Sequence, residues 1–146
     1  MTNPIVLDSG VLGKIVYPRG NPDVETWFEQ ILAHGVNVIL AEIADYELRR
    51  ELLHLGFTRS LERLNRLKSM LTYLPLNTAV MLKAAELWSE ARKRGRPTAD
   101  PKALDVDVIL AAQAIQVGGI IVTENVRHLS LFVEAKHWGE ISQMLT

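Results

Sequence analysis

The sequence contains no cysteine among its 146 residues. This absence excludes disulfide bonds, thiolate metal sites and a cysteine nucleophile, so any metal ion has to be held by oxygen or imidazole ligands. Aromatic residues are also scarce, at 6% of the chain. We expect them in the core or in an interface, because so few rings do not suggest a platform for stacked bases.

No stretch of the chain approaches the length of an apolar membrane span. The first residues also lack the basic region and apolar run of a secretory signal peptide. We therefore expect no membrane partner and a cytoplasmic location. With 48% hydrophobic and 23% charged residues, the composition is that of one compact domain, which we expect to span residues 1–146.

An excess of positive charge is missing as well, because the formal net charge is −1. Nucleic-acid-binding proteins usually gain affinity for phosphates from surplus lysine and arginine. Basic residues nevertheless gather in two segments, 49–68 and 92–96, and the second reads Arg92-Lys93-Arg94-Gly95-Arg96. Taken alone, such runs are typical of a solvated face and do not identify a partner.

Short apolar runs alternate with amphipathic segments along the chain. The runs predict strands at residues 5–7, 36–40 and 120–123, with an edge strand at 74–76. The amphipathic segments predict helices at 23–33, 41–55, 58–71, 78–94 and 101–117. Apolar strands separated by helices indicate an α/β fold with three layers, in which a mainly parallel sheet is flanked by helices.

Ligands of an open parallel sheet gather at the carboxyl ends of its strands. Asp8 follows the first predicted strand, and Thr123-Glu124-Asn125 follows the last. If these two strands are neighbours, an acid and an amide oxygen meet at one edge of the sheet. Asp8 alone is equally well explained as the cap of the helix that follows it.

The predicted helix 101–117 carries two acids, Asp105 and Asp107, which point in roughly opposite directions. We favour Asp107 for the site, because the small residues Ala111 and Ala114 follow it at helical spacing and allow close approach to the sheet. The ordinary explanation for such an acid is favourable charge near a helix N-terminus.

Four segments together resemble the PIN-domain family, including the VapC-type toxins of toxin–antitoxin systems. They span nearly the whole chain in the family's order. The segments are Ile5-Val6-Leu7-Asp8-Ser9, Ala44-Asp45-Tyr46-Glu47-Leu48, Asp107-Val108-Ile109-Leu110-Ala111-Ala112 and Val122-Thr123-Glu124-Asn125 with Val126-Arg127-His128-Leu129.

Glu47 depends most on this resemblance. By pattern alone it is a solvated helix glutamate, and its neighbours Asp45 and Arg49 form a plain surface pair four residues apart. The family position makes Glu47 the second acid of a site.

The resemblance implies a ribonuclease that hydrolyses RNA phosphodiesters. Asp8, Glu47 and Asp107 are its expected ligands for Mg²⁺ or Mn²⁺, the hard cations that carboxylate oxygens favour. Asn125 would complete or orient the shell, although many family members carry a fourth aspartate there. The substitution removes one negative charge, which leaves metal affinity and full activity open.

The same resemblance implies partners around the acids. The RNA contacts are expected from Arg92, Lys93, Arg94, Arg96 and Thr123, with Arg49 and Arg50 as alternatives. In this family the helices that correspond to residues 41–71 also form homodimers and antitoxin-binding grooves, so a homodimer and an antitoxin partner are expected.

Two other functions are compatible with parts of the pattern. A PIN-like module could bind RNA or protein without cutting, because Asn125 weakens the expected metal site. A phosphatase-like hydrolase would use Asp8 as its nucleophile. That class normally repeats an acid two residues later, where this chain has Gly10.

Overall fold

The computed structural model describes residues 3–95 and 101–144, without the side chains of 101–103 and 142–144. Within these residues the core is a five-stranded sheet in the order β3-β2-β1-β4-β5. Every neighbouring pair of strands is parallel. The strands are β1 (Ile5–Leu7), β2 (Val38–Ala41), β3 (Thr72–Leu74), β4 (Ile120–Val122) and β5 (Ala135–Lys136).

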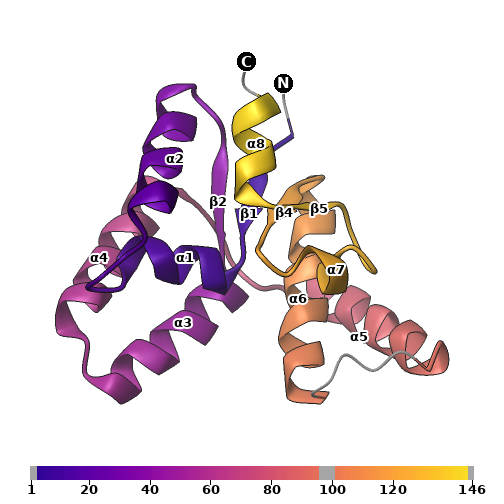
Figure 1. Cartoon of the computed structure of the whole chain (residues 1–146). Helices are drawn as coiled ribbons and strands as arrows, with labels where there is room; N and C mark the ends of the chain where they lie inside the picture. The colour runs from indigo at the N-terminus through magenta and orange to yellow at the C-terminus, as the bar shows by residue number, and fades with distance from the viewer. Residues whose placement is uncertain (1–2, 96–100, 145–146) are drawn as a thin grey trace.

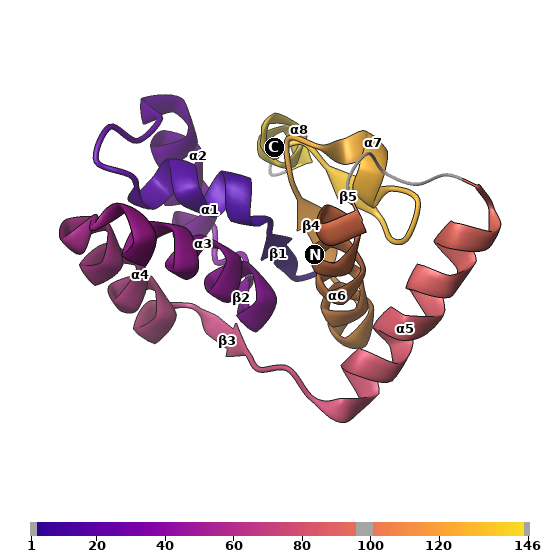
Figure 2. The same cartoon turned by 90° about the horizontal axis from the view of Figure 1, so that it is seen from below.

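The helices form a layer on each face of this sheet. They are α1 (Ser9–Val16), α2 (Pro22–Ala33), α3 (Glu42–Leu55), α4 (Thr58–Met70), α5 (Thr78–Lys93), α6 (Pro101–Val117), α7 (Val126–Leu129) and α8 (Trp138–Met144). Helices α1 to α4 lie on one side and α5 with α6 on the other, as Figures 1 and 2 show. This arrangement confirms the predicted three-layer α/β fold.

The strand order creates a crevice between β1 and β4. The chain leaves β1 towards β2 through α1 and α2, whereas it returns to β4 through α5 and α6 on the opposite face. Such a reversal is where open α/β sheets bind ligands, at the carboxyl ends of the two strands. The pairing of Leu7 with Val122 confirms that the first and last predicted strands are neighbours.

Most predicted helix boundaries agree with the structure within one or two residues, but several strand predictions need correction. The edge strand is Thr72–Leu74 and not 74–76, because Pro75 has no N–H to donate and the ladder ends before it. The second strand begins at Val38 and not Val36. Helices α1, α7 and α8 and strand β5 were not predicted from the sequence. Residues 96–100 of the predicted loop lie outside the described part.

A buried glutamine joins the two helices that carry candidate acids. Gln113 of α6 is fully buried. Its Oε1 accepts a hydrogen bond from the Ile43 backbone N–H of α3 at 3.2 Å, and its Nε2 donates to the Leu74 carbonyl at 2.8 Å. The relative positions of α3 and α6 are therefore fixed by hydrogen bonds as well as by apolar packing.

Across residues 3–95 and 101–144, none of the helices combines the length and the apolar character that a bilayer crossing requires.

Candidate metal centre

Asp8 lies at the carboxyl end of β1 and caps α1. Its Oδ1 accepts a hydrogen bond from the Ser9 backbone N–H at 2.7 Å, and its Oδ2 accepts one from the Thr123 hydroxyl at 2.7 Å. Burial raises the pKa of Asp8 above its ordinary value, and the charge of Glu47 raises it further, against the lowering effect of both hydrogen bonds. The cap and the site are thus two roles of one side chain.

Thr123 follows β4 and connects the two strand ends. It is 0% exposed, and its hydroxyl also accepts a hydrogen bond from the Asn125 backbone N–H at 2.8 Å. The Thr123 hydroxyl, which was expected to contact RNA, is buried and engaged on both sides. The residue orients Asp8.

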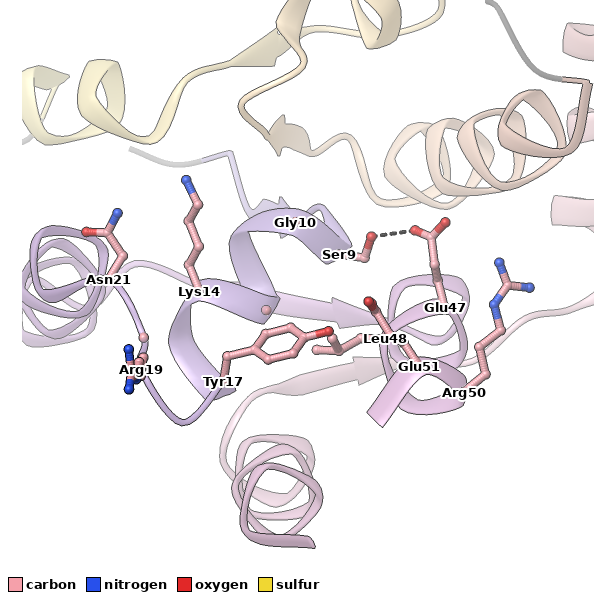
Figure 3. A pocket seen from close by; sticks show the side chains of 12 residues that line it. Ser9, Gly10, Lys14, Tyr17, Arg19, Asn21, Glu47, Leu48, Arg50 and Glu51 are labelled. Atoms are coloured by element: carbon pink, nitrogen blue, oxygen red, sulfur yellow. Dashed lines mark hydrogen bonds between the residues drawn. The ribbon is translucent and has the colours of Figure 1, made fainter. Parts of the chain in front are cut away.

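Glu47 projects from α3 towards the start of α1. The Ser9 hydroxyl donates a hydrogen bond to its Oε1, as Figure 3 shows. The sequence analysis assigned no role to Ser9. Its position directly after Asp8, at the carboxyl end of a predicted strand, could have indicated one. Through Ser9, the side chains at the carboxyl end of β1 and on α3 are connected.

Asp45, two residues before Glu47, is not the surface residue expected from the sequence. Its salt bridge to Arg49 is present at 2.9 Å, but Asp45 is only 4% exposed. It also accepts a hydrogen bond from the Tyr73 hydroxyl at 3.3 Å. The pair is part of the packing between α3 and β3, which leaves Glu47 as the acid of this helix that faces Ser9.

Asp107 comes from α6 on the other side of the sheet. Burial, followed by the charges of Asp8 and Glu47, raises its pKa from 3.8 to about 7. Like charges raise a carboxyl pKa in this way only when they lie close to it. The three acids are thus gathered around one region, whereas Asp105 is exposed to solvent.

The three carboxylates are close but not fully converged. Within the described part of the chain, no three His, Cys, Asp or Glu side chains are arranged tightly enough to hold a metal ion as they stand. Neighbouring carboxylates repel one another, and a bound cation would offset this repulsion. The donor set itself, three acids with no thiol and no imidazole, fits a hard divalent cation.

Glu124 and Asn125 follow Thr123, and each has hydrogen-bond partners of its own. Asn125 is exposed, and its Nδ2 donates to Nδ1 of His128 at 3.0 Å. Glu124 accepts hydrogen bonds from Lys14 and from Trp138 Nε1, the latter at 3.1 Å. The hydrogen bond from Lys14 lowers the pKa of Glu124. Glu124 therefore connects α1 to α8, and Asn125 remains a candidate ligand through its oxygen.

A cavity of about 680 Å³ opens beside Ser9 and Glu47, between α1, the following loop and α3. Figure 3 shows Lys14, Arg19 and Arg50 around it. Burial and the hydrogen bond with Glu51 raise the pKa of Tyr17, another lining residue, to about 12. Its phenol is therefore neutral at physiological pH, and the cavity offers cationic side chains next to the acids.

The other basic residues expected to contact RNA lie at the end of α5. The Arg92 guanidinium stacks on the Trp88 ring at 5.3 Å, and Arg94 is 3.9 Å from Glu90. Lys93 is exposed, and Arg96 lies outside the described residues. Both overall views place this end of α5 away from α1 and α3. Of the alternatives, Arg50 lines the cavity and Arg49 binds Asp45.

Comparison with known proteins decides the family. The family model of the PIN domain matches residues 5–131 of the chain. The chain belongs to the PIN-domain family. PIN domains as a family are nucleases that act on phosphodiester bonds.

Solved structures of other PIN-fold chains agree with this fold. A chain of FitAcB from Neisseria gonorrhoeae has a TM-score of 0.73 at 22% identity, covering 92% of this chain and 98% of its own. A chain of promoter-bound VapBC2 from Rickettsia felis has a TM-score of 0.75 at 15% identity, covering 92% and 98%. A chain of DNA-bound VapBC from Salmonella typhimurium has a TM-score of 0.72 at 19% identity, covering 94% and 99%. The search of curated proteins gives no significant match.

Proposed function

We propose that this PIN domain is a metal-dependent ribonuclease, with Asp8, Glu47 and Asp107 as the ligands of one Mg²⁺ or Mn²⁺ ion. The observation that carries the proposal is the arrangement of the acids at the carboxyl end of β1, where Ser9 contacts both Asp8 and Glu47. Asp107 of α6 lies close enough for the charges of both acids to raise its pKa. Three acids from distant parts of the sequence therefore share one region. Gathering like charges costs stability, and clusters of this kind occur preferentially at functional sites.

The side chains around the acids prepare them for this role. Thr123 and the Ser9 backbone N–H hold Asp8 in one orientation while leaving lone pairs on both of its oxygens. Ser9 holds Glu47 from the opposite side. When bound, a hard divalent cation supplies a water that ionises near neutral pH and positive charge beside the phosphate. Asp107 would release its proton as this charge arrives.

RNA would approach through the cavity between α1 and α3. Arg19 and Arg50 offset the negative charge of the acids, which would otherwise repel the phosphates. The residues that line the cavity come from α1, the loop after it and α3, and they do not form an element that could enter the groove of a double-stranded nucleic acid. We therefore expect selection of exposed single-stranded RNA by shape. The basic end of α5 is a second, more distant contact in this proposal.

The solved neighbours suggest a biological setting. They are VapBC and FitAB complexes, three of them bound to DNA. We infer that this chain is the toxin of a toxin–antitoxin pair, which acts in the cytoplasm, binds an antitoxin protein and forms a homodimer. A short reading frame beside its gene that encodes a DNA-binding protein would support this inference, and its absence would favour an RNA-processing role.

RNA cleavage with matched acid variants tests the enzyme. Wild type should cut single-stranded RNA with Mg²⁺ or Mn²⁺ and lose activity in EDTA. Asp107→Asn should lose about 100-fold or more, because the ion loses a ligand. Asp105→Asn, which removes the same charge from an exposed position of the same helix, should stay within about twofold of wild type. Equal rates in all three proteins would refute the proposal.

Mn²⁺ binding separates the nuclease from a module that binds RNA without cutting. Calorimetry should show Mn²⁺ binding to wild type and its loss in Asp107→Asn. RNA binding without any Mn²⁺ binding would favour the non-cutting module, in which Asn125 has weakened the site.

A further inference from the structure

A second cavity, of about 310 Å³, lies at the start of α4. It is separate from the cavity beside the acids, but both include residues of the loop after α1: Tyr17 and Arg19 line the first, and Pro18 lines the second. The residues that line it are Pro18, Gly56, Phe57, Thr58, Arg59, Ser60 and Arg63. None of these residues has a part in the proposed hydrolysis.

The N-terminus of α4 has no side-chain cap at this cavity, although the Thr58 backbone N–H donates to the Gly56 carbonyl at 3.0 Å. Gly56 has a φ of 73°, a left-handed conformation that ends α3 and lets α4 begin two residues later. The N-cap position is then occupied by Phe57, and among the described side chains none caps the helix. The first turn also contains no acid. An uncapped helix start presents backbone N–H groups and the positive end of the helix dipole.

A buried hydroxyl without a partner lies in the same cavity wall. Ser60 is 1% exposed, and its Oγ has no hydrogen-bond partner within the part of the chain that the structure describes. Buried polar atoms are normally paired, because an unpaired one loses its hydrogen bond to water without replacement. An acceptor oxygen in the cavity would provide the missing partner.

The charged side chains that line the cavity are both positive. Arg59 is exposed, and Arg63 is half-buried, with Nη1 donating to the Tyr17 carbonyl at 3.4 Å. That contact holds the Arg63 guanidinium against the loop between the two cavities. The described residues that line this cavity include no carboxylate. Two guanidinium groups next to a helix N-terminus match the charge and the planar donor geometry that a phosphate requires.

We propose that the cavity at the start of α4 binds a phosphate group through the Arg59 and Arg63 guanidinium groups, the Arg59 and Ser60 backbone N–H groups and the Ser60 hydroxyl. Helix N-termini with these neighbours are established anion sites in proteins. The phosphate is either a phosphodiester of an RNA strand that continues past the acids, or a free phosphate ion. The site does not depend on cleavage.

Titration of the full chain with inorganic phosphate, followed by amide NMR at constant ionic strength, tests the site. The Arg59 and Ser60 amides should shift in a saturable way. Arg59→Gln and Ser60→Ala should each weaken phosphate binding about fivefold or more. Arg66→Gln removes the same charge from an exposed position on the same helix that does not line the cavity, so it should change binding less than about twofold.

A competition arm identifies the source of the phosphate. A single-stranded RNA decamer without terminal phosphates, added in EDTA so that it is not cut, displaces inorganic phosphate if the site holds a phosphodiester. If it does not, the site holds a free ion. Two results would overturn the proposal: no saturation at the Arg59 and Ser60 amides, or an equal loss in Arg59→Gln and Arg66→Gln. Neither result bears on hydrolysis, which the acid variants test separately.

Discussion

Replacing Asp107 by asparagine should stabilise the metal-free protein, although it removes a proposed ligand. The folded protein holds a proton on Asp107 up to about pH 7, whereas the unfolded chain releases it near the ordinary value of 3.8. Since the folded state binds the proton more tightly, the contribution of Asp107 to stability falls as pH rises from about 4 to about 7. Above that window the folded protein carries a repelled charge that asparagine lacks.

The two pKa values set an upper limit on the effect. Their difference corresponds to about 4 kcal/mol. Asp107 is only partly buried, so solvent screens its repulsion and we expect about 1–2 kcal/mol at pH 8. For a chain of this length that is an increase in Tm of about 3–8 °C. At pH 4 the gain should be small, because Asp107 is then protonated in the folded protein and, close to its ordinary pKa of 3.8, about half protonated in the unfolded chain.

Thermal unfolding in EDTA at pH 4 and pH 8 measures this effect, with Asp105→Asn as the control for removing an exposed acid from the same helix. Adding Mn²⁺ at pH 8 should then raise the Tm of wild type and leave Asp107→Asn unchanged. A variant less stable than wild type at pH 8 in EDTA would show that the three acids do not repel one another. A gain of equal size at both pH values would show that its cause is not electrostatic.

Three further substitutions test the surroundings of the acids. Thr123→Val keeps the side-chain shape but removes the hydrogen bond to Asp8, so the rate of RNA cleavage should fall about 10-fold. Thr123→Ser keeps this hydrogen bond and should cleave at a rate close to that of wild type. Equal rates for the two variants would contradict the orienting role. Asn125→Asp should tighten Mn²⁺ binding about 10-fold in calorimetry by adding a negative charge, and an unchanged affinity would exclude this position from the site. Gln113→Leu leaves two buried backbone groups unpaired, so urea unfolding should show a loss of about 2–4 kcal/mol. The exposed Gln116→Leu should change stability by less than about 0.5 kcal/mol, and a comparable loss there would contradict the explanation.

The layers of the fold could be predicted from the sequence because each central strand is apolar on both faces. Ile5–Leu7 and Ile120–Val122 are buried throughout, which is typical of strands covered by helices on both sides. Strand β5 could not be predicted in the same way. It is two residues long and half-buried, so its pairing with β4 leaves no apolar pattern to detect.

The candidate site was predictable only in part, because its acids come from elements with different local patterns. Asp8 follows a buried strand, and that position alone places it at the sheet edge. Glu47 lies within a helix rather than after a strand, so no local pattern distinguishes it, and only the family resemblance selected it. The burial of Asp45 depends on Tyr73, a residue of a different element, so no pattern within α3 could reveal it.

The hydrogen bond between Thr123 and Asp8 joins residues 115 positions apart, at the centre of the sheet. A nascent chain that has left the ribosome as far as α5 therefore contains two of the acids but neither Asp107 nor the strand that orients Asp8. The proposed metal site can therefore assemble only when most of the polypeptide is available to fold.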